Sequence, residues 1–128
     1  MEKITSKEEK IMELFWEHEK LFIREILELI PNPKPHFNTI STVVRSLEEK
    51  GYLYHKAYGN SHRYYTNISK EEFKSSSIRS VVSKYFNNSI FSMVSTLVSN
   101  KELSADELKE LKDLVKKAEK AEKAEKAD

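Results

Sequence analysis

The sequence predicts a mainly α (α+β) protein, with an N-terminal winged helix-turn-helix followed by a C-terminal helical arm. Two observations support the winged module: three helical patterns precede two short aromatic runs, and a small polar turn separates those runs. A third observation supports the arm, because helical patterns without proline or glycine follow residue 69. We therefore expect a winged-helix domain at 1–68, a helical domain at 69–117 and a helical or frayed tail at 118–128.

The first two helices precede a proline-rich connection. A capping-box pattern at residues 5–9 predicts the start of the first helix, and its apolar positions extend the helix to about Lys20. Apolar residues at helical spacing predict a second helix over 22–30. The prolines within 31–35 cannot continue a helix, so a stiff connection should follow.

The third helix, from about residue 36 to Lys50, is the most informative segment because its two faces differ. One stripe is apolar: Ile40, Val43, Val44 and Leu47. The opposite face carries short polar side chains and an arginine: Asn38, Thr42, Arg45 and Glu49. An asparagine can bond adenine bidentately and an arginine can bond guanine or a phosphate, so this face suits the major groove of DNA. Gly51 suits the left-handed position that ends the helix.

The segments 52–58 and 62–66 are aromatic-rich runs separated by Gly59-Asn60-Ser61, which predicts two antiparallel strands and a tight turn. Basic side chains beside a small polar tip suit a wing that lies along phosphates. Such contacts position a protein on DNA more than they specify sequence. The residues expected to contact DNA are Asn38, Thr39, Ser41, Thr42, Arg45, Lys56, Ser61 and Arg63.

The arm has three helical stretches, with capping boxes at 69–72 and 104–107 and a break at Asn87-Asn88. Its apolar stripes are too wide for an isolated extension to bury, so they need a partner. A second copy of the chain is the economical partner, which makes 69–117 a C-terminal helical dimerisation arm. The alternative is that these helices fold back onto the winged module. The expected dimerisation residues are Ile78, Val82, Tyr85, Phe86, Ile90, Met93, Val94, Leu97, Leu108, Leu111 and Val115.

The tail at 118–128 repeats Ala-Glu-Lys and has no apolar stripe. Such a repeat forms helix readily but has nothing to pack. We expect a solvated extension without a functional role.

Composition excludes several classes of protein. The 128 residues, with a net charge of +1, suffice for one compact module and an accessory segment. Without cysteine the chain has no disulfides, thiolate metal sites or thiol chemistry. No apolar run approaches the roughly 20 residues that cross a bilayer, and no signal-peptide core follows Met1, so we expect a cytoplasmic protein without membrane insertion. Residues 34–65 carry five Lys and Arg against two acids, which concentrates positive charge on the expected nucleic-acid segment.

Short motifs in a fixed order extend from about residue 4 to 116. They are Thr5-Ser6 through Glu9, Leu14-Phe15-Trp16, Asn38-Thr39-Ile40 with Thr42 and Leu47, Lys50-Gly51-Tyr52-Leu53, Tyr65, Phe86-Asn87-Asn88-Ser89, and Leu103-Ser104 through Glu107-Leu108. In these motifs the chain resembles the BlaI/MecI penicillinase-repressor family, which also includes CopY-like copper-responsive repressors. The resemblance implies a homodimeric transcriptional repressor that binds a dyad operator in double-stranded DNA.

The chain departs from this family in three ways. Ser46 occupies a position that is usually basic, which puts one DNA contact in question. In the antibiotic-responsive branch, a membrane-bound sensor metalloprotease cuts an Asn-Phe bond in the dimerisation arm. Thr96-Leu97 aligns with that bond here, so cleavage is suggested by the family but not by these residues. The copper branch senses copper through a C-terminal cysteine motif, which this chain lacks.

Two other function classes compete with a repressor. A winged helix can be a protein-interaction adaptor without DNA binding, which the near-neutral net charge favours slightly. An enzyme is disfavoured because the chain has no Gly-rich phosphate loop, no complete metal-ligand cluster and no nucleophile-base pair. His55 and His62 could approach each other across the hairpin, but two histidines alone rarely form a metal site. We therefore expect no metal and no cofactor.

Overall fold

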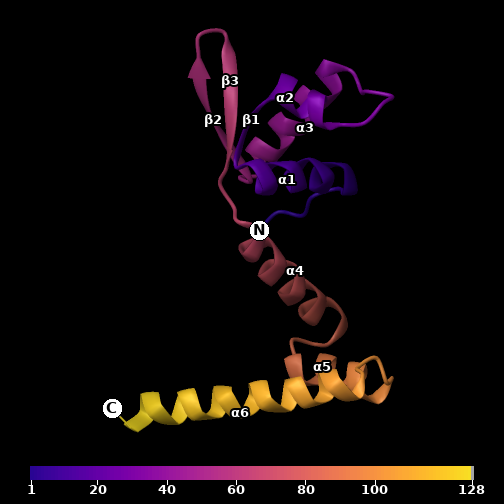
Figure 1. Ribbon diagram of the computed structural model, residues 1–128, viewed down its shortest axis with the longest axis vertical. Coiled ribbons are helices and arrows are strands. Elements are labelled where there is room, and N and C mark those ends of the chain that lie inside the picture. Colours follow the sequence, from indigo (N-terminus) through magenta and orange to yellow (C-terminus); the bar gives the residue numbers. More distant parts are fainter. Residues whose placement is uncertain (128) are drawn as a thin grey trace. The chain divides into compact units, whose positions relative to one another are not determined.

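The computed structural model describes residues 1–127, and the chain divides into two compact units, residues 1–78 and the residues from Arg79 onward (Figure 1). The elements before residue 67 are α1 (Ser6–His18), β1 (Lys20–Phe22), α2 (Ile23–Leu29), α3 (Phe37–Glu49), β2 (Leu53–Tyr58) and β3 (Ser61–Thr66). Three helices follow: α4 (Lys70–Tyr85), α5 (Ile90–Ser99) and α6 (Ala105–Ala127). This order confirms the predicted α+β class. Asp128, the end of the predicted tail, lies outside the described residues.

Helix α1 begins as predicted but ends earlier. The Glu8 amide donates to Thr5 Oγ1 at 3.1 Å and the Thr5 amide donates to Glu8 Oε1 at 2.8 Å, which completes the capping box. The prediction that the helix extends to Lys20 was wrong. Glu19 has a φ of +68°, outside the helical region, and Lys20 is already part of a strand.

Strand β1 is the element that the sequence did not predict. It pairs antiparallel with β3, and β3 pairs antiparallel with β2, so the sheet has the order β1-β3-β2. Phe22 therefore belongs to the sheet, opposite Arg63, and α2 begins one residue later than predicted. The Phe22 amide donates to Glu25 Oε1 at 2.8 Å, so this backbone N–H at the start of α2 has a hydrogen-bond partner.

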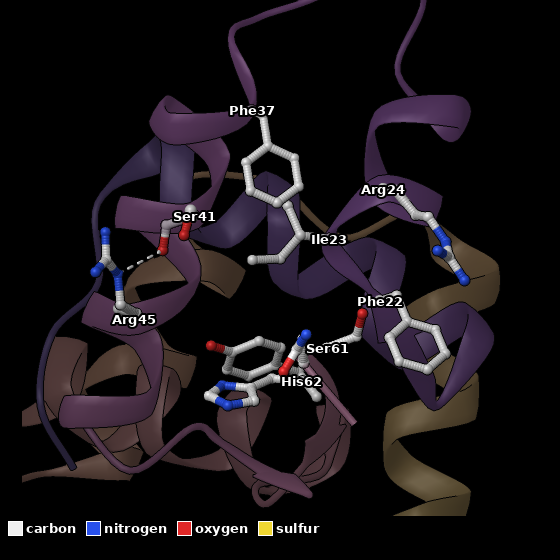
Figure 2. A pocket seen from close by; sticks show the side chains of 10 residues that line it. Phe22, Ile23, Arg24, Phe37, Ser41, Arg45, Ser61 and His62 are labelled. Carbon is white, nitrogen blue, oxygen red and sulfur yellow. Dashed lines mark hydrogen bonds between the residues drawn. The ribbon is translucent and has the colours of Figure 1, made fainter. Parts of the chain in front are cut away.

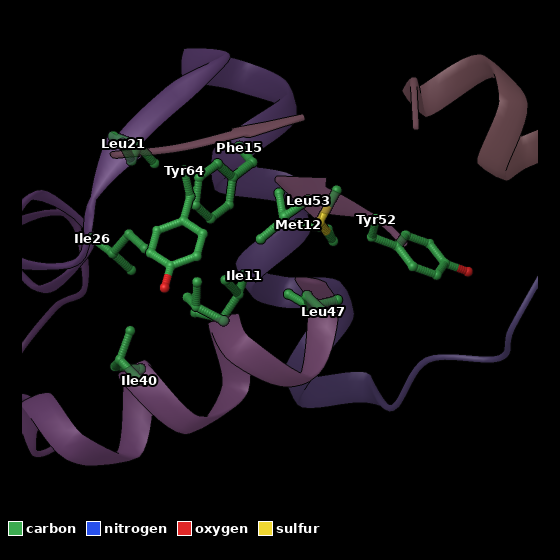
Figure 3. Packing of buried hydrophobic residues seen from close by; sticks show 11 residues of the cluster. Ile11, Met12, Phe15, Leu21, Ile26, Ile40, Leu47, Tyr52, Leu53 and Tyr64 are labelled. Carbon is green, nitrogen blue, oxygen red and sulfur yellow. The ribbon is translucent and has the colours of Figure 1, made fainter. Parts of the chain in front are cut away.

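The core of the first unit lies between the helices and one face of the sheet (Figure 3). Helix α3 contributes its predicted inner stripe, since Ile40, Val44 and Leu47 are at most 2% exposed, while Val43 is half-buried at the edge. The other buried apolar residues of this unit are Ile11, Met12, Phe15, Leu21, Ile26, Tyr52, Leu53 and Tyr64. Each large side chain of this kind stabilises the fold by roughly 1.5–3 kcal/mol.

Trp16 connects the core to the first turns of α4. Its indole Nε1 donates to the Ile68 carbonyl at 2.9 Å, and its ring centroid lies 5.2 Å from that of Phe73. The Ser69 hydroxyl accepts from the Glu72 amide at 3.1 Å, which confirms the predicted cap of this helix. The base of α4 is therefore held in the first unit.

Glu8 joins α1 to the C-terminal part of α3. Its side chain is 6% exposed, and it accepts hydrogen bonds from Lys50 Nζ and Ser46 Oγ, each at 2.8 Å. Burial alone raises the pKa of Glu8, but the hydrogen bonds from Lys50, Thr5 and Ser46 lower it by more, from 4.5 to about 2. The carboxylate is thus charged in the folded protein near neutral pH, although it is buried.

The second unit contains the rest of α4 with α5 and α6. Asn87 and Asn88 adopt left-handed φ values of +51° and +63°, which asparagine tolerates better than most residues, so the predicted break is confirmed. Ser89 caps α5 by accepting from the Ser92 amide at 3.0 Å. Helix α6 continues through the Ala-Glu-Lys repeat to Ala127 with its side chains exposed. Within the described residues, no helix is both long and apolar enough to span a bilayer.

The lowered pKa of Glu8 predicts acid sensitivity. Because the folded-state pKa is below the unfolded-state value, its stabilisation is complete above about pH 4.5 and is lost as the pH falls toward 2. We expect Glu8→Gln to reduce the free energy of unfolding by on the order of 2–3 kcal/mol at pH 7 and to flatten its decline between pH 5 and 2. Denaturant titrations across this range measure both effects.

Glu13→Gln is the matched control for this test, because Glu13 is 49% exposed and pairs with Lys70 on the surface. Its pH profile should follow that of the wild type. Parallel curves for wild type and Glu8→Gln from pH 5 to 2 would contradict the assignment.

Candidate nucleic-acid interface

The outer face of α3 presents the polar side chains that the sequence predicted for DNA. Asn38, Thr42 and Arg45 are exposed, while Thr39 and Ser41 are half-buried. The Thr42 hydroxyl donates to the Asn38 carbonyl at 2.9 Å, which leaves its lone pairs free to accept from a base. The inner stripe packs in the core, so this face is held outward by the fold and not by its own side chains.

A cleft of about 410 Å³ separates α3 from the tip of the wing (Figure 2). It is lined by Phe22, Ile23, Arg24, Phe37, Ser41, Arg45, Asn60, Ser61, His62 and Tyr64. Two guanidinium groups and no carboxylate stand among these lining residues, so the cleft favours an anionic partner. Hydroxyl, amide and imidazole groups in the same cleft provide hydrogen-bond donors and acceptors for phosphates and base edges.

The cleft unites only some of the predicted residues. Ser41, Arg45 and Ser61 line it together. The remaining predicted contacts, which are Asn38, Thr39, Thr42, Lys56 and Arg63, are not among its lining residues. The other seven lining residues were not predicted as DNA contacts: Phe22, Ile23, Arg24, Phe37, Asn60, His62 and Tyr64. A signal existed for Phe37, because it precedes Ser41 and Arg45 by one and two turns of the same helix.

The outer face of the sheet holds the two predicted basic wing residues against aromatic rings. Lys56 and Arg63 are cross-strand partners on this face. Lys56 Nζ lies 5.1 Å from the centroid of Tyr65, and Arg63 Cζ lies 5.1 Å from Phe22 and 5.8 Å from Tyr58. Arg63 Nε is buried without a hydrogen-bond partner in the described part of the chain. Its guanidinium is therefore partly committed to the packing of the sheet.

On the inner face of the wing, His55 contacts α3 and His62 stacks on His55. His55 Nδ1 lies 2.6 Å from Glu48 Oε2, and the rings of His55 and His62 stack with centroids 4.2 Å apart and an angle of 11°. In nearly parallel rings the in-plane nitrogen lone pairs do not converge on one ion. The described residues form no group of three or more metal-binding side chains. Beside this stack, burial and the charge of Glu48 raise the pKa of Tyr64, which Arg45 partly opposes.

The family model described as Penicillinase repressor matches residues 4–117. The chain belongs to the penicillinase repressor family. Among the curated relatives, the Penicillinase repressor of Bacillus licheniformis is 28% identical over 108 residues, which is 84% of each chain. The Methicillin resistance regulatory protein MecI of Staphylococcus aureus (strain N315) is 26% identical over 108 residues, covering 84% of this chain and 88% of MecI. The protein of that name from Mammaliicoccus sciuri is also 26% identical, over 112 residues.

Membership of the penicillinase repressor family supports a transcriptional repressor and not an enzyme. Ser46 occupies a position at which the family resemblance led us to expect a basic residue. Ser46 is half-buried and donates to Glu8 at 2.8 Å, so it serves the joint between α1 and α3 and does not line the cleft.

Most of the residues predicted for dimerisation are accessible to solvent on the arm. Six are exposed: Ile78, Tyr85, Ile90, Leu97, Leu108 and Val115. Four are half-buried: Phe86, Met93, Val94 and Leu111. Val82 is only 5% exposed and packs within the chain. Four further members of the apolar stripes of the arm are also exposed: Val81, Phe91, Val98 and Leu114.

The residues aligned with the family cleavage bond lie inside a helix. Thr96 and Leu97 are exposed residues of α5, and Thr96 Oγ1 donates to the Ser92 carbonyl at 3.0 Å. A protease that cuts extended chain would need this turn of α5 to open first.

Proposed function

We propose that this protein is a homodimeric, sequence-specific repressor that binds a dyad operator and occludes a promoter. The observation that supports this most directly is the cleft without acidic lining residues between α3 and the wing, beside a polar helix face. In helix-turn-helix proteins the second helix of the motif enters the major groove with its N-terminal residues at the bases. Here that helix is α3, packed after α2.

The contacts divide into readers of bases and binders of phosphates. Asn38 and Thr42 are exposed on the first two turns of α3, where they reach base edges. Arg45 lies one turn further on and bonds either a guanine or a phosphate. On the wing, Lys56 and Ser61 contact phosphates, which fixes the position of the protein on the duplex. Arg63 contributes positive charge from within its aromatic setting.

Footprinting after selection from random duplexes tests the DNA-binding half of the proposal. We expect protection of two inverted half-sites about one or two helical turns apart, with affinity that falls steeply as salt rises. Arg45→Ala should weaken operator binding by about tenfold or more, and should weaken binding to an unrelated duplex less. Arg79→Ala removes the same charge from an exposed position in α4 and is the matched control.

Equal losses on both duplexes would assign Arg45 to phosphate only. If no dyad is protected and binding does not respond to salt, the repressor proposal fails and a protein-interaction adaptor takes its place.

The homodimer is proposed from the apolar surface of the arm. Ile90 and Phe91 at the start of α5 are 65% and 81% exposed, and Tyr85 just before them is 66% exposed. Water-facing apolar side chains this close together are typical of a protein interface. A second copy satisfies the need with the same residues on both sides, as a twofold axis requires.

Phe91→Asp should convert the dimer into a monomer in sedimentation experiments at micromolar concentration, because the charge would be buried in an apolar contact. Operator affinity should fall with it, since the two half-sites are then bound independently. Thr96→Asp adds the same charge elsewhere on α5 at an exposed polar position and should leave the dimer intact. Wild-type protein that sediments as a single chain would contradict the dimer.

Release by a membrane-bound sensor metalloprotease is proposed from the resemblance of this chain to the antibiotic-responsive branch of its family. The cut would fall between Thr96 and Leu97 and remove the end of α5 with all of α6 from the arm. Mass spectrometry of the chain recovered from cells with the target gene induced should detect a fragment that ends at Thr96. Intact chain under full induction would exclude this route.

A further inference from the structure

Phe37 is a large apolar side chain that the core does not use. It is the first residue of α3 and is 50% exposed, whereas Ile40, Val44 and Leu47 of the same helix are at most 2% exposed. Its ring lies at the cleft between α3 and the wing (Figure 2). An exposed aromatic ring at the edge of a cleft is available for contact with a partner that enters it.

The position of Phe37 places it among the proposed DNA contacts. Phe37, Ser41 and Arg45 are spaced by four residues, so they form one row along α3, and all three line the cleft. Arg45 Nε interacts with the Ser41 carbonyl at 3.4 Å along this row, at the other end from Phe37. The row therefore runs from an apolar group at the N-terminal end of the helix to a cation further along it.

This inference rests on the proposed operator binding and deepens it. A phenyl ring cannot bond a phosphate oxygen or the polar edge of a base. Among the groups that base pairs expose in the major groove, the C5-methyl group of thymine is the apolar one, and phenylalanine is one of the side chains that contact it. We propose that Phe37 is a specificity-determining residue that contacts the C5-methyl group of a thymine in each half-site.

The surroundings of Phe37 support a methyl contact over a second protein. Phe22, Ile23 and Tyr64 also line the cleft, so the apolar surface near Phe37 lies beside the two guanidinium groups of Arg24 and Arg45. A partner that fits must offer an apolar group next to negative charge, which a thymine methyl flanked by phosphates does. On the wing side, Asn60, Ser61 and His62 add amide, hydroxyl and imidazole groups to the lining.

The test removes single methyl groups from the DNA. Once the operator is known, each thymine of the half-site is replaced in turn by deoxyuridine in both half-sites, which deletes only the C5-methyl group. Loss of one buried methyl group should weaken binding about three- to fivefold, and therefore about tenfold or more for the symmetric pair. We expect one thymine position to show this loss with the wild-type dimer.

Variants assign that loss to Phe37. Phe37→Ala should bind the thymine and deoxyuridine operators equally well, whereas Phe37→Leu should keep part of the difference. Arg45→Ala should bind both operators more weakly and keep the full ratio between them, because it changes a polar contact. Circular dichroism melting of each variant checks the fold, which an exposed residue at a helix start should scarcely affect.

The outcomes separate this inference from the proposed function. A wild-type dimer that protects a dyad but tolerates every deoxyuridine overturns the role of Phe37 and leaves the repressor standing. Phe37→Ala that keeps the full thymine preference gives the methyl contact to another residue and also overturns the inference. Failure to protect any dyad overturns the repressor proposal itself.

Discussion

The buried carboxylate of Glu8 is the contact on which the presentation of α3 depends. Among the described residues it is the one charged side chain that is buried, and it joins α1 to Ser46 and Lys50 at the C-terminal part of α3. Apolar packing can hold the inner stripe of α3 but leaves rotation about the helix axis loosely specified, because side chains adapt. Hydrogen bonds of fixed geometry restrict that rotation. The polar face of α3 then points outward in a single orientation, as the proposed contact with base edges requires.

Positive charge in the segment 34–65 is used more for structure than the sequence suggested. Lys34 donates to the Leu27 and Ile30 carbonyls at 2.6 and 2.8 Å, which satisfies the end of α2. Lys50 is paired with Glu8, and Arg63 lies against aromatic rings. Arg45 and Arg24 are the guanidinium groups that line the cleft. The local excess of bases thus falls in the segment that forms α3 and the wing, but counting charges could not show which of these side chains cap or pack and which line the cleft.

The sequence predicted features that depend on local chemistry and missed those that depend on distant partners. Helical periodicity identified the inner stripe of α3, and capping boxes placed the starts of α1 and α4. Strand β1 has three residues, too few for a period, and forms because β3, some forty residues later, offers a paired edge. The burial of Glu8 likewise depends on Lys50. Phe37 was not predicted as a contact residue because the sequence does not show that its side chain lies beside a cleft.

The two units differ in how many apolar side chains they bury, and this difference determines which unit needs a partner to cover its apolar surface. The first unit buries eleven apolar side chains, whereas Val82 is the one buried apolar residue in the described part of the second. The first unit can therefore hold α3 and the wing in place by itself. In the proposed dimer, association would cover the apolar surface of the second unit, and the stability of that unit would then depend on protein concentration. Under the proposed function, operator binding would bring two copies together on one duplex and stabilise the arms, while loss of the arms would lower affinity without disturbing the winged module. On this proposal, regulation that acts on the arm alone would control DNA binding by the winged module.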